Sequence, residues 1–336
     1  MTTVVTGASG FIGSVLVREL MSRGRSVRAV VRSNRKGLEG LDIEIVEADV
    51  RSPSSLRSAF DGAESVFHLA SVIALAGDRS GQVTETNVKG AENVARAALD
   101  AGVKKFVHCS SIHVFDLKDR GVAIDEGTKR ISAAHPVYDR TKAAGEAAVR
   151  EIIKLGLPGV IIHPTGVMGP GDHRPSRIGQ ALLDLSSKKL PALISGGFNW
   201  VDVRDVCAGA ISAEESGHAG EGYILSGEWH STRELATFGE ELTGMAPPRL
   251  EVPMWMARNL APVGNFLGWL NRTEFQLNSD TVSALSGART ISCAKAKREL
   301  GYRSRSIRQS VHDTYKWFEE SGMLKRPLPL IDGYQP

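Results

Sequence analysis

The chain has 336 residues, of which 42% are hydrophobic and 24% charged, and its formal net charge is +3. This composition predicts one large or two modest domains with a real core and excludes an intrinsically disordered chain. The 41 Lys and Arg are scattered among 38 acidic residues, which predicts no nucleic-acid-binding surface. Three widely spaced cysteines favour a reducing, cytoplasmic location and predict neither a disulfide framework nor a metal site. We also expect no signal peptide and no transmembrane segment, because a strand pattern starts at residue 2 and apolar runs are short.

Short β-branched runs alternate with helical patterns in the first half of the chain. We expect strands at Thr2–Thr6, Ser26–Val31, Ile43–Val46, Ser65–Leu69, Lys105–Cys109 and Gly159–His163. We expect helices between them at Phe11–Arg23, Pro53–Phe60, Thr84–Ala101 and Pro136–Leu155. Strands that alternate with helices predict parallel pairing, and near-continuous apolar strands predict helices on both faces of the sheet. The predicted fold is therefore an α/β doubly wound parallel sheet.

The pattern changes after Pro164. Pro, Gly and basic residues crowd 164–175, which we expect to be a loop beyond the carboxyl end of a strand, where ligands bind in open α/β sheets. Helical patterns follow at Ile178–Lys189, Val203–Glu215, Thr232–Thr243 and Ser306–Ser321. One more strand is expected near 222–226, returning to the first sheet. The chain therefore divides into residues 1–165 and a smaller, mostly helical and interleaved part over 166–336.

Large apolar side chains are concentrated in 252–270, which Pro262, Gly264 and Gly268 interrupt. One interpretation is an amphipathic lid or a patch that contacts a membrane surface. The other is a pair of core-packing helices in the smaller part. We favour the second, because large apolar residues are usually buried.

A glycine-rich turn, Thr6–Gly13, joins the first predicted strand to the first predicted helix. Gly7, Gly10 and Gly13 allow a tight turn, close approach of a pyrophosphate and close packing of helix on strand. The start of the helix offers free N–H groups and a positive dipole end to an anion. At the first strand–helix junction this spacing predicts a dinucleotide site.

The end of the second strand distinguishes the two nicotinamide dinucleotides. An acid there binds the ribose 2′-OH of NAD, whereas an Arg accommodates the 2′-phosphate of NADP. Here the strand ends at Arg32 and continues through Arg35 without an acid. A guanidinium binds phosphate bidentately, so we expect NADP(H) in preference to NAD(H), bound by Arg32 with help from Arg35. The alternative is that these residues form a solvated basic turn.

With this cofactor site, we expect residues 1–165 to form an NADP-binding Rossmann domain and residues 166–336 to form a substrate-binding lobe.

Tyr138 and Lys142 lie four residues apart on a predicted helix that Pro136 begins, so their side chains share one face. A nearby ammonium is expected to lower the pKa of the tyrosine and make it a proton donor and acceptor near neutrality. Ser111 follows the fifth strand, and its hydroxyl could stabilise an oxyanion in the same crevice. The Tyr138–Lys142 spacing alone is weak evidence for a catalytic site. Its position after the fifth strand, beside Ser111, makes the evidence stronger.

Together these motifs resemble the extended short-chain dehydrogenase/reductases of the NAD(P)-dependent epimerase/dehydratase superfamily. The resemblance covers essentially the whole chain. The matching segments are Thr6–Gly13, Ala48–Val50, His68–Ala70, Asn87–Gly90, Ser110–Phe115, Tyr138–Lys142, His163–Gly171 and Lys297–Tyr302.

The resemblance implies a role for each matched residue. It implies that the pyrophosphate is held by Gly7, Gly10, Phe11, Ile12 and Gly13. It implies that the rest of the cofactor lies along Asp49, Val50, Leu69, Ala70, Ser71, Lys142, Pro164 and Thr165. Ser111, Tyr138 and Lys142 would be catalytic, and Asn87 would support the active site through the helix that carries it. Family members often dimerise through the helices that bear Asn87 and Tyr138, which implies a homodimer.

Two departures narrow the activity. Ile112 and His113 stand where sugar-nucleotide dehydratases carry an Asp-Glu pair, so dehydration lacks its acid and base. The stretch 196–203 lacks the Arg with which nucleotide-sugar enzymes bind a diphosphate. Arg174 and Arg177 are the nearby alternatives for that charge, so a sugar nucleotide is disfavoured.

The segments Val27–Arg32 and Phe198–Val203 resemble the dihydroflavonol-reductase-like and 3β-hydroxysteroid-dehydrogenase-like branch, which acts on apolar or aromatic ketones and alcohols. This implies hydride transfer to a carbonyl carbon with Tyr138 as proton donor. We expect the small-molecule pocket to include His113, Met168, Arg174 and Trp200. Two other hypotheses stand: a sugar-nucleotide epimerase, and a non-catalytic NADP-binding sensor, against which the intact Ser111–Tyr138–Lys142 set argues.

Overall fold

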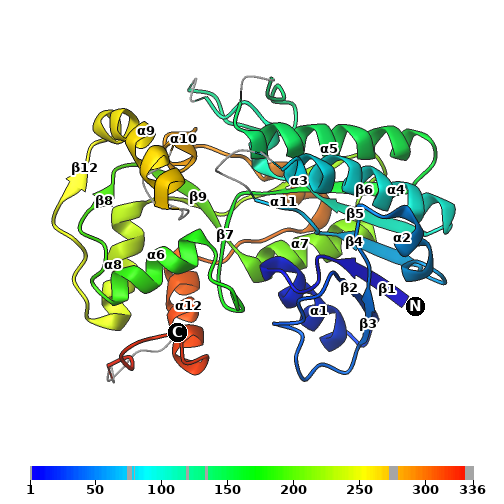
Figure 1. Cartoon of the computed structure of the whole chain (residues 1–336), viewed down its shortest axis with the longest axis horizontal. Coiled ribbons are helices and arrows are strands. Elements are labelled where there is room, and N and C mark those ends of the chain that lie inside the picture. Colours follow the sequence, from blue (N-terminus) through cyan, green and yellow to red (C-terminus); the bar gives the residue numbers. More distant parts are fainter. Residues whose placement is uncertain are drawn as a thin grey trace.

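A seven-stranded sheet with parallel neighbours forms the middle layer of the larger part of the molecule, on the right in Figure 1, in the order β10-β6-β5-β4-β1-β2-β3. This is a computed structural model, which describes residues 2–73, 78, 80–118, 121–132, 135–271 and 279–329, with the backbone alone for 263–271 and 279–280. The strands are β1 Thr2–Thr6, β2 Ser26–Val31, β3 Glu44–Glu47, β4 Ser65–His68, β5 Lys105–Cys109, β6 Gly159–Pro164 and β10 Gly222–Leu225. The predicted doubly wound sheet is confirmed.

Helices cover both faces of this sheet, as its apolar strands predict. One face carries α1 (Phe11–Ser22), α7 (Val203–Ser216) and α11 (Ala294–Leu300), whose apolar residues share a buried cluster with Val5, Phe67 and Val107. The other face carries α2 (Pro53–Ala59), α4 (Gly90–Asp100) and α5 (Val137–Lys154), which share a second cluster with Val4, Val66 and Phe106. Alternate residues of each strand therefore enter opposite cores.

The helix expected at Thr84–Ala101 is not a single regular α-helix. It consists of α3 (Gln82–Thr84), a π-helical turn η1 (Glu85–Lys89) and α4. This turn packs tightly on α5: a Cβ added to Gly145 would lie 2.1 Å from the carbonyl oxygen of Asn87. A π-helical turn is a local irregularity that is frequent at functional sites. Here it brings Asn87 against the helix that bears Tyr138 and Lys142.

The second part of the chain adds small sheets and helices around a third apolar cluster. A three-stranded sheet has the order β11-β9-β7, and a two-stranded sheet pairs β12 with β8. Its strands are β7 Gly166–Met168, β8 Leu193–Ile194, β9 Gly197–Asp202, β11 Trp229–Ser231 and β12 Glu251–Val252. Its helices are α6 Arg177–Ser186, α8 Thr232–Thr243, α9 Met254–Asn271, α10 Ser279–Leu285 and α12 Ile307–Glu320.

The prediction that 164–175 is entirely a loop was wrong, because β7 lies within it. Gly166 pairs with Trp200 in parallel register. The rings of Phe198 and Trp200 lie against Gly166, where an added Cβ would be 2.6 and 2.8 Å from them. The strand therefore depends on contacts with β9, more than thirty residues along the chain, and not on a local apolar pattern.

The segment 252–270 contains the end of β12 and one helix, α9, which begins at Met254, and not the pair of helices that we favoured. Pro262 lies inside this helix. Ala257 and Ala261 are buried and pack with Val282, whereas Trp255 is 64% exposed. The apolar side chains beyond Pro262 lie outside the described residues. Within the described part of the chain, no helix is long and apolar enough to cross a membrane.

Candidate active site

The turn between β1 and α1 has the geometry of an anion cradle. Gly7 has φ +70°, and a Cβ there would lie 2.6 Å from the backbone nitrogen of Ala70. A Cβ on Gly13 would lie 2.2 Å from the carbonyl oxygen of Gly7. Helix α1 begins at Phe11, followed by Ile12, and its first turn has no described side-chain cap and no acid. Its first N–H groups are therefore available to a pyrophosphate, so the residues present fit a dinucleotide.

The carboxyl ends of β2 and β3 bring several charges together. Arg32 and Arg35 are exposed after β2. Asp49 follows β3, and its carboxylate forms an ion pair of 2.5 Å with Arg51. The hydrogen bonds and positive charge of Arg51, together with the more distant charge of Arg32, hold the pKa of the Asp49 carboxyl below its usual range. The ion pair of Asp49 with Arg51 was not predicted from the sequence, although the two residues are only two positions apart. Val50, between them, is buried and contacts Gly90.

Asn87 joins the segment after β4 to helix α5. Its side-chain oxygen accepts a hydrogen bond from Val72 N at 2.8 Å. Its side-chain nitrogen donates to Val72 O at 2.9 Å and to Thr141 Oγ1 at 3.1 Å. Thr141 precedes Lys142, so one amide joins the segment after β4 to the helix that carries Tyr138 and Lys142. The intervening residues expected along the cofactor are Leu69, Ala70 and Ser71, of which Ser71 is exposed.

The structure brings Ser111, Tyr138 and Lys142 together at the carboxyl end of β5. The side chains of Ser111 and Tyr138 are near enough to interact, and this interaction favours the ionised form of the Tyr138 phenol. Ser111 Oγ also accepts from the backbone N–H of His113 at 3.2 Å. Lys142 is 5% exposed, and its Nζ donates to the carbonyl oxygen of Cys109 at 2.8 Å. These three side chains therefore lie where the end of β5 meets α5, at the edge of the sheet where a carbonyl oxygen could bind.

The expectation that Lys142 lowers the pKa of Tyr138 is not met. Burial raises the pKa of Tyr138, and the interaction with Ser111 opposes this only in part. Burial also lowers the pKa of Lys142. The physical reason is that loss of water disfavours the charged form of each group. In this state Tyr138 is a protonated phenol, which is the form that donates a proton.

Of the four side chains expected in the substrate pocket, His113 lies beside the catalytic group. Its ring is edge-on to Tyr138, with centroids 6.2 Å apart, and stacked on Phe198 at 5.9 Å. Met168 is 1% exposed within the third apolar cluster, so its position is that of a core residue. Trp200 is also nearly buried and donates from Nε1 to His230 O at 3.0 Å. Arg174 is exposed on the loop between β7 and α6.

The end of β6 presents a buried hydroxyl to the same region. Pro164 is the last residue of β6, and Thr165 follows it with 8% of its surface exposed. Thr165 Oγ1 has no hydrogen-bond partner among the described residues. A buried hydroxyl without a partner is costly, so this atom fits a polar group of a bound ligand.

A buried ionic network behind the site was not predicted. Glu146 is only 2% exposed. Its carboxylate accepts hydrogen bonds from Ser110 Oγ at 2.6 Å, from Arg130 at 3.1 Å and from Arg150 at 2.9 Å. It also lies 2.8 Å from Nε2 of His163. Burial alone would raise the pKa of the Glu146 carboxyl, but these partners lower it. Because Ser110 precedes Ser111, the network fixes α5 against the strand end that carries the catalytic hydroxyl.

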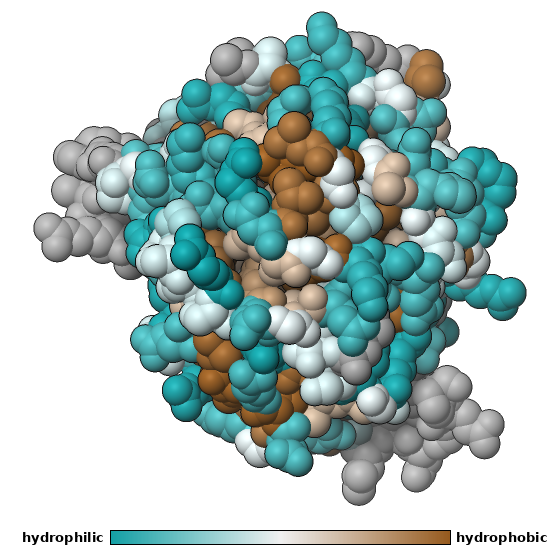
Figure 2. Space-filling view, turned by 90° about the vertical axis from the view of Figure 1, so that its right-hand side faces the viewer, coloured by the Kyte–Doolittle hydropathy of each residue, from teal (hydrophilic) through white to brown (hydrophobic). Residues whose placement is uncertain are grey.

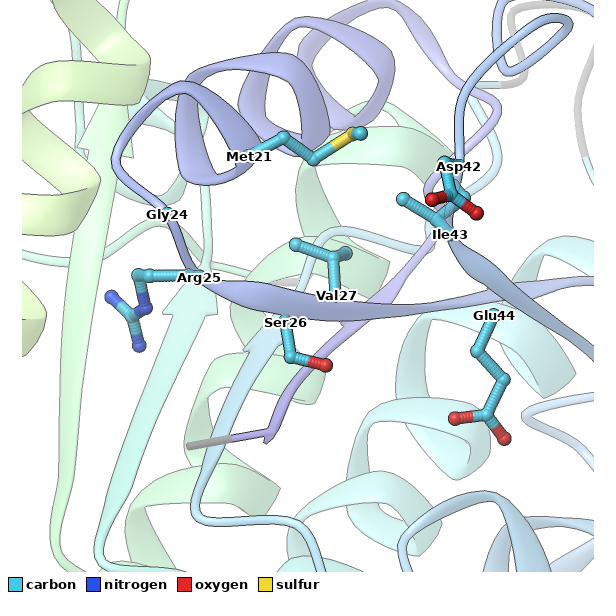
Figure 3. Close-up of a pocket in the computed structure, with 8 residues that line it drawn as sticks. All are labelled: Met21, Gly24, Arg25, Ser26, Val27, Asp42, Ile43 and Glu44. Atoms are coloured by element: carbon cyan, nitrogen blue, oxygen red, sulfur yellow. The ribbon is translucent and has the colours of Figure 1, made fainter.

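A surface hollow lies at the opposite end of the sheet. The view onto the end of the molecule where β1 begins shows apolar areas separated by hydrophilic side chains (Figure 2). The hollow is lined by the amino-terminal residues of β2, including Ser26 and Val27, and by Asp42 and Glu44 near β3 (Figure 3). Ligands of open α/β sheets bind at the carboxyl ends of the strands. We therefore place the active site at Ser111 and not in this hollow.

Comparison with known proteins identifies the family of the chain. Residues 3–225 match the model of the NAD dependent epimerase/dehydratase family. The chain is 33% identical to "Sterol demethylase protein B" of Methylococcus capsulatus, over 96% of this chain and 100% of that protein. It is 28% identical to "4-hydroxy-2-methyl-3-oxo-4-farnesyl-3,4-dihydroquinoline-1-oxide ketoreductase" of Stigmatella aurantiaca, over 97% and 99%. It is 30% identical to "Sterol-4-alpha-carboxylate 3-dehydrogenase, decarboxylating" of Mus musculus, over 89% and 85%.

A solved structure agrees over the whole fold. The crystal structure of gox2253 matches with a TM-score of 0.84 and 34% identity, covering 96% of this chain and 99% of that one. Three observations agree on the family of the chain: the matching family model, these relatives and the glycine turn at the end of β1. The chain belongs to the NAD dependent epimerase/dehydratase family.

Proposed function

We propose that the chain is an NADP(H)-dependent oxidoreductase that reduces a ketone of an apolar small molecule, or oxidises the corresponding alcohol. The observation that carries this proposal is the convergence of Ser111, Tyr138 and Lys142 at the carboxyl end of β5. These are a hydroxyl pair that can hold a carbonyl oxygen and a buried cation on the same helix face.

The residues of the chain have separate tasks in this reaction. When bound, the nicotinamide supplies the hydride. Tyr138 donates its phenolic proton to the carbonyl oxygen, and burial, which raises its pKa, keeps that proton in place until the oxygen becomes basic. Ser111 orients the same oxygen through its hydroxyl. Lys142, fixed by the Cys109 carbonyl, retains further N–H donors for a ribose hydroxyl.

The charges near β2 and β3 support NADP(H) over NAD(H). Arg32 and Arg35 are exposed, and neither has a described hydrogen-bonded acid. The nearby Asp49 carboxylate is already bound to Arg51. A ribose 2′-phosphate near the end of β2 would therefore meet guanidinium groups.

The substrate class follows from the apolar wall and from the relatives. His113 and Phe198 stack beside Tyr138, which fits a flat apolar molecule. The printed names of two relatives reported above place an oxygen-containing group at position 4, beside position 3: a 4-hydroxyl beside a 3-oxo group in the ketoreductase, and a 4-carboxylate in the 3-dehydrogenase. We extend this to the chain: its ketone carries an oxygen function on the carbon next to the carbonyl.

A panel of aliphatic, aromatic and steroidal ketones, assayed by oxidation of NADPH, tests this function. We expect turnover of ring ketones with an adjacent oxygen function, and slower turnover with NADH. Turnover also removes the non-catalytic sensor hypothesis. If the purified chain retains a tightly bound cofactor, interconverts UDP- or dTDP-sugars and oxidises no NADPH with any ketone, the epimerase hypothesis replaces this one.

A further inference from the structure

Three histidines form a buried row across adjacent strands of the main sheet. His163, His108 and His68 come from β6, β5 and β4, and they are 0%, 2% and 1% exposed. His108, in the middle, pairs with His68 in register, and the centroids of these two rings are 5.3 Å apart. The ring of His108 projects toward the face covered by α5, because it follows by two residues Phe106, which belongs to the cluster on that face.

The outer histidines of the row each bond a neighbour, and the middle one does not. Nδ1 of His68 lies 2.8 Å from Thr6 Oγ1, and Nε2 of His163 lies 2.8 Å from a carboxylate oxygen of Glu146. Neither ring nitrogen of His108 has a hydrogen-bond partner among the described residues. An imidazole buried with both nitrogens unpaired is costly, so these atoms fit a small polar ligand beside the ring.

The surroundings of His108 keep its ring neutral. Burial and the positive charge of Lys142 hold the pKa of His108 well below its ordinary value. Other ionisable groups that act on the ring are His68 on β4, Glu146 on α5 and His163 on β6, and of these three only Glu146 favours the charged form. A neutral imidazole carries one N–H donor and one lone-pair acceptor. His108 therefore offers a lone pair near the ammonium of Lys142.

Lys142 reaches the strand that bears this histidine. It comes from α5, and its Nζ donates a hydrogen bond of 2.8 Å to the carbonyl oxygen of Cys109, the residue directly after His108. An ammonium has three N–H groups, and this bond uses one of them. Since His108 has no direct partner, a bridge between the two side chains needs a small molecule that both accepts and donates a hydrogen bond. Water is such a molecule.

We propose that a buried water molecule accepts a hydrogen bond from Lys142 Nζ and donates one to the lone-pair nitrogen of His108. This makes His108 a positioning residue, which acts through the water on Lys142. The bridge fixes the ammonium over the end of β5 and stabilises its charged form. The effect on Lys142 rests on the proposed reductase function, in which Lys142 is catalytic, whereas the water site itself does not.

A high-resolution crystal structure of the whole chain tests the water site without any turnover. We expect an ordered water within about 3.2 Å of both Lys142 Nζ and one ring nitrogen of His108. A structure with no ordered water at this position, or with both ring nitrogens bonded to protein atoms, overturns the inference.

The pH dependence of ketone reduction tests the effect on Lys142. Burial lowers the pKa of Lys142 and raises that of Tyr138, so Lys142 is the first of the two to lose its proton as the pH rises. His108→Leu removes the bridge, which should lower the pKa of Lys142 further and move the alkaline loss of kcat down by about one pH unit. His108→Gln keeps a donor and an acceptor and should restore most of this shift.

A control variant and the remaining outcomes complete the test. His218→Leu, at an exposed histidine before β10, should leave the pH profile unchanged. An unshifted profile in His108→Leu, or an equal shift in the Leu and Gln variants of His108, overturns the role of His108 as a positioning residue. If the water is present but NADPH reduces no ketone, the proposed function fails and the water site stands.

Discussion

Lys142 Nζ donates a hydrogen bond of 2.8 Å to the carbonyl oxygen of Cys109, which joins the middle of α5 to the end of β5. The same helix face carries Tyr138 one turn earlier and Glu146 one turn later, and Glu146 binds Ser110, the next residue after Cys109. The catalytic helix is thus fixed to the catalytic strand at two successive residues. The geometry of the site depends on this attachment.

Arg32→Ala should weaken binding of NADPH by about ten- to a hundredfold, the loss expected for a charge-assisted hydrogen bond to phosphate. Binding of NADH should change by less than about threefold, because NADH has no 2′-phosphate. Fluorescence titration with each cofactor at one moderate salt concentration measures both effects. The control is Arg57→Ala on α2, which removes an exposed cation elsewhere. An equal effect on the two cofactors would refute the assignment of Arg32.

Gly145→Ala should destabilise the chain by about 1–3 kcal/mol or more, because the new Cβ would lie 2.1 Å from the Asn87 carbonyl oxygen and force α5 away from η1. Urea denaturation measures the free energy of unfolding. The adjacent, exposed Ala144→Ser is the control, and it should change that free energy by no more than about 0.5 kcal/mol. Equal stability of the two variants would show that α5 and η1 are not closely packed.

Glu146→Gln should destabilise the chain at neutral pH by about 1–3 kcal/mol, since it leaves two partly exposed arginines and the buried His163 with a weaker partner. The sign of the pH dependence follows from the pKa of Glu146, which is lowered in the folded chain. Its contribution to stability is therefore complete above the pKa of the unfolded state, about 4.3, and is lost as the pH falls below it.

The difference in unfolding free energy between Glu146→Gln and the unmodified chain should accordingly shrink from pH 7 to pH 3. Urea titrations of both chains at several pH values measure it. The exposed Glu151→Gln on the same helix is the control and should show almost no difference at any pH. A constant difference across this range would mean that the Glu146 charge does not stabilise the fold.

Features with a local chemical cause could be predicted from the sequence. Apolar β-branched runs located the strands of the main sheet, and the spacing of Gly7, Gly10 and Gly13 located the anion cradle, because both depend on neighbouring residues. The pair of Tyr138 and Lys142 was also predictable, because helical periodicity alone places them on one face.

Features that depend on distant residues could not be predicted in the same way. Strand β7 forms because β9 pairs with it, and Glu146 is buried because Arg130, Arg150 and His163 surround it. The expected direction of the Tyr138 pKa is also wrong, because the spacing to Lys142 is visible in the sequence and the burial of the phenol is not. Met168, expected in the pocket, instead completes the core of the second part.

The most direct test of the central claim is Tyr138→Phe, which removes the phenolic hydroxyl and keeps the ring. We predict that kcat for ketone reduction falls by about a hundred- to ten-thousandfold, as expected for loss of a general acid, while the Kd for NADPH stays within about threefold. Single-turnover reduction and fluorescence titration on the same preparation measure the two quantities. Retention of most of the activity with normal NADPH binding would contradict the proposal that Tyr138 donates the proton.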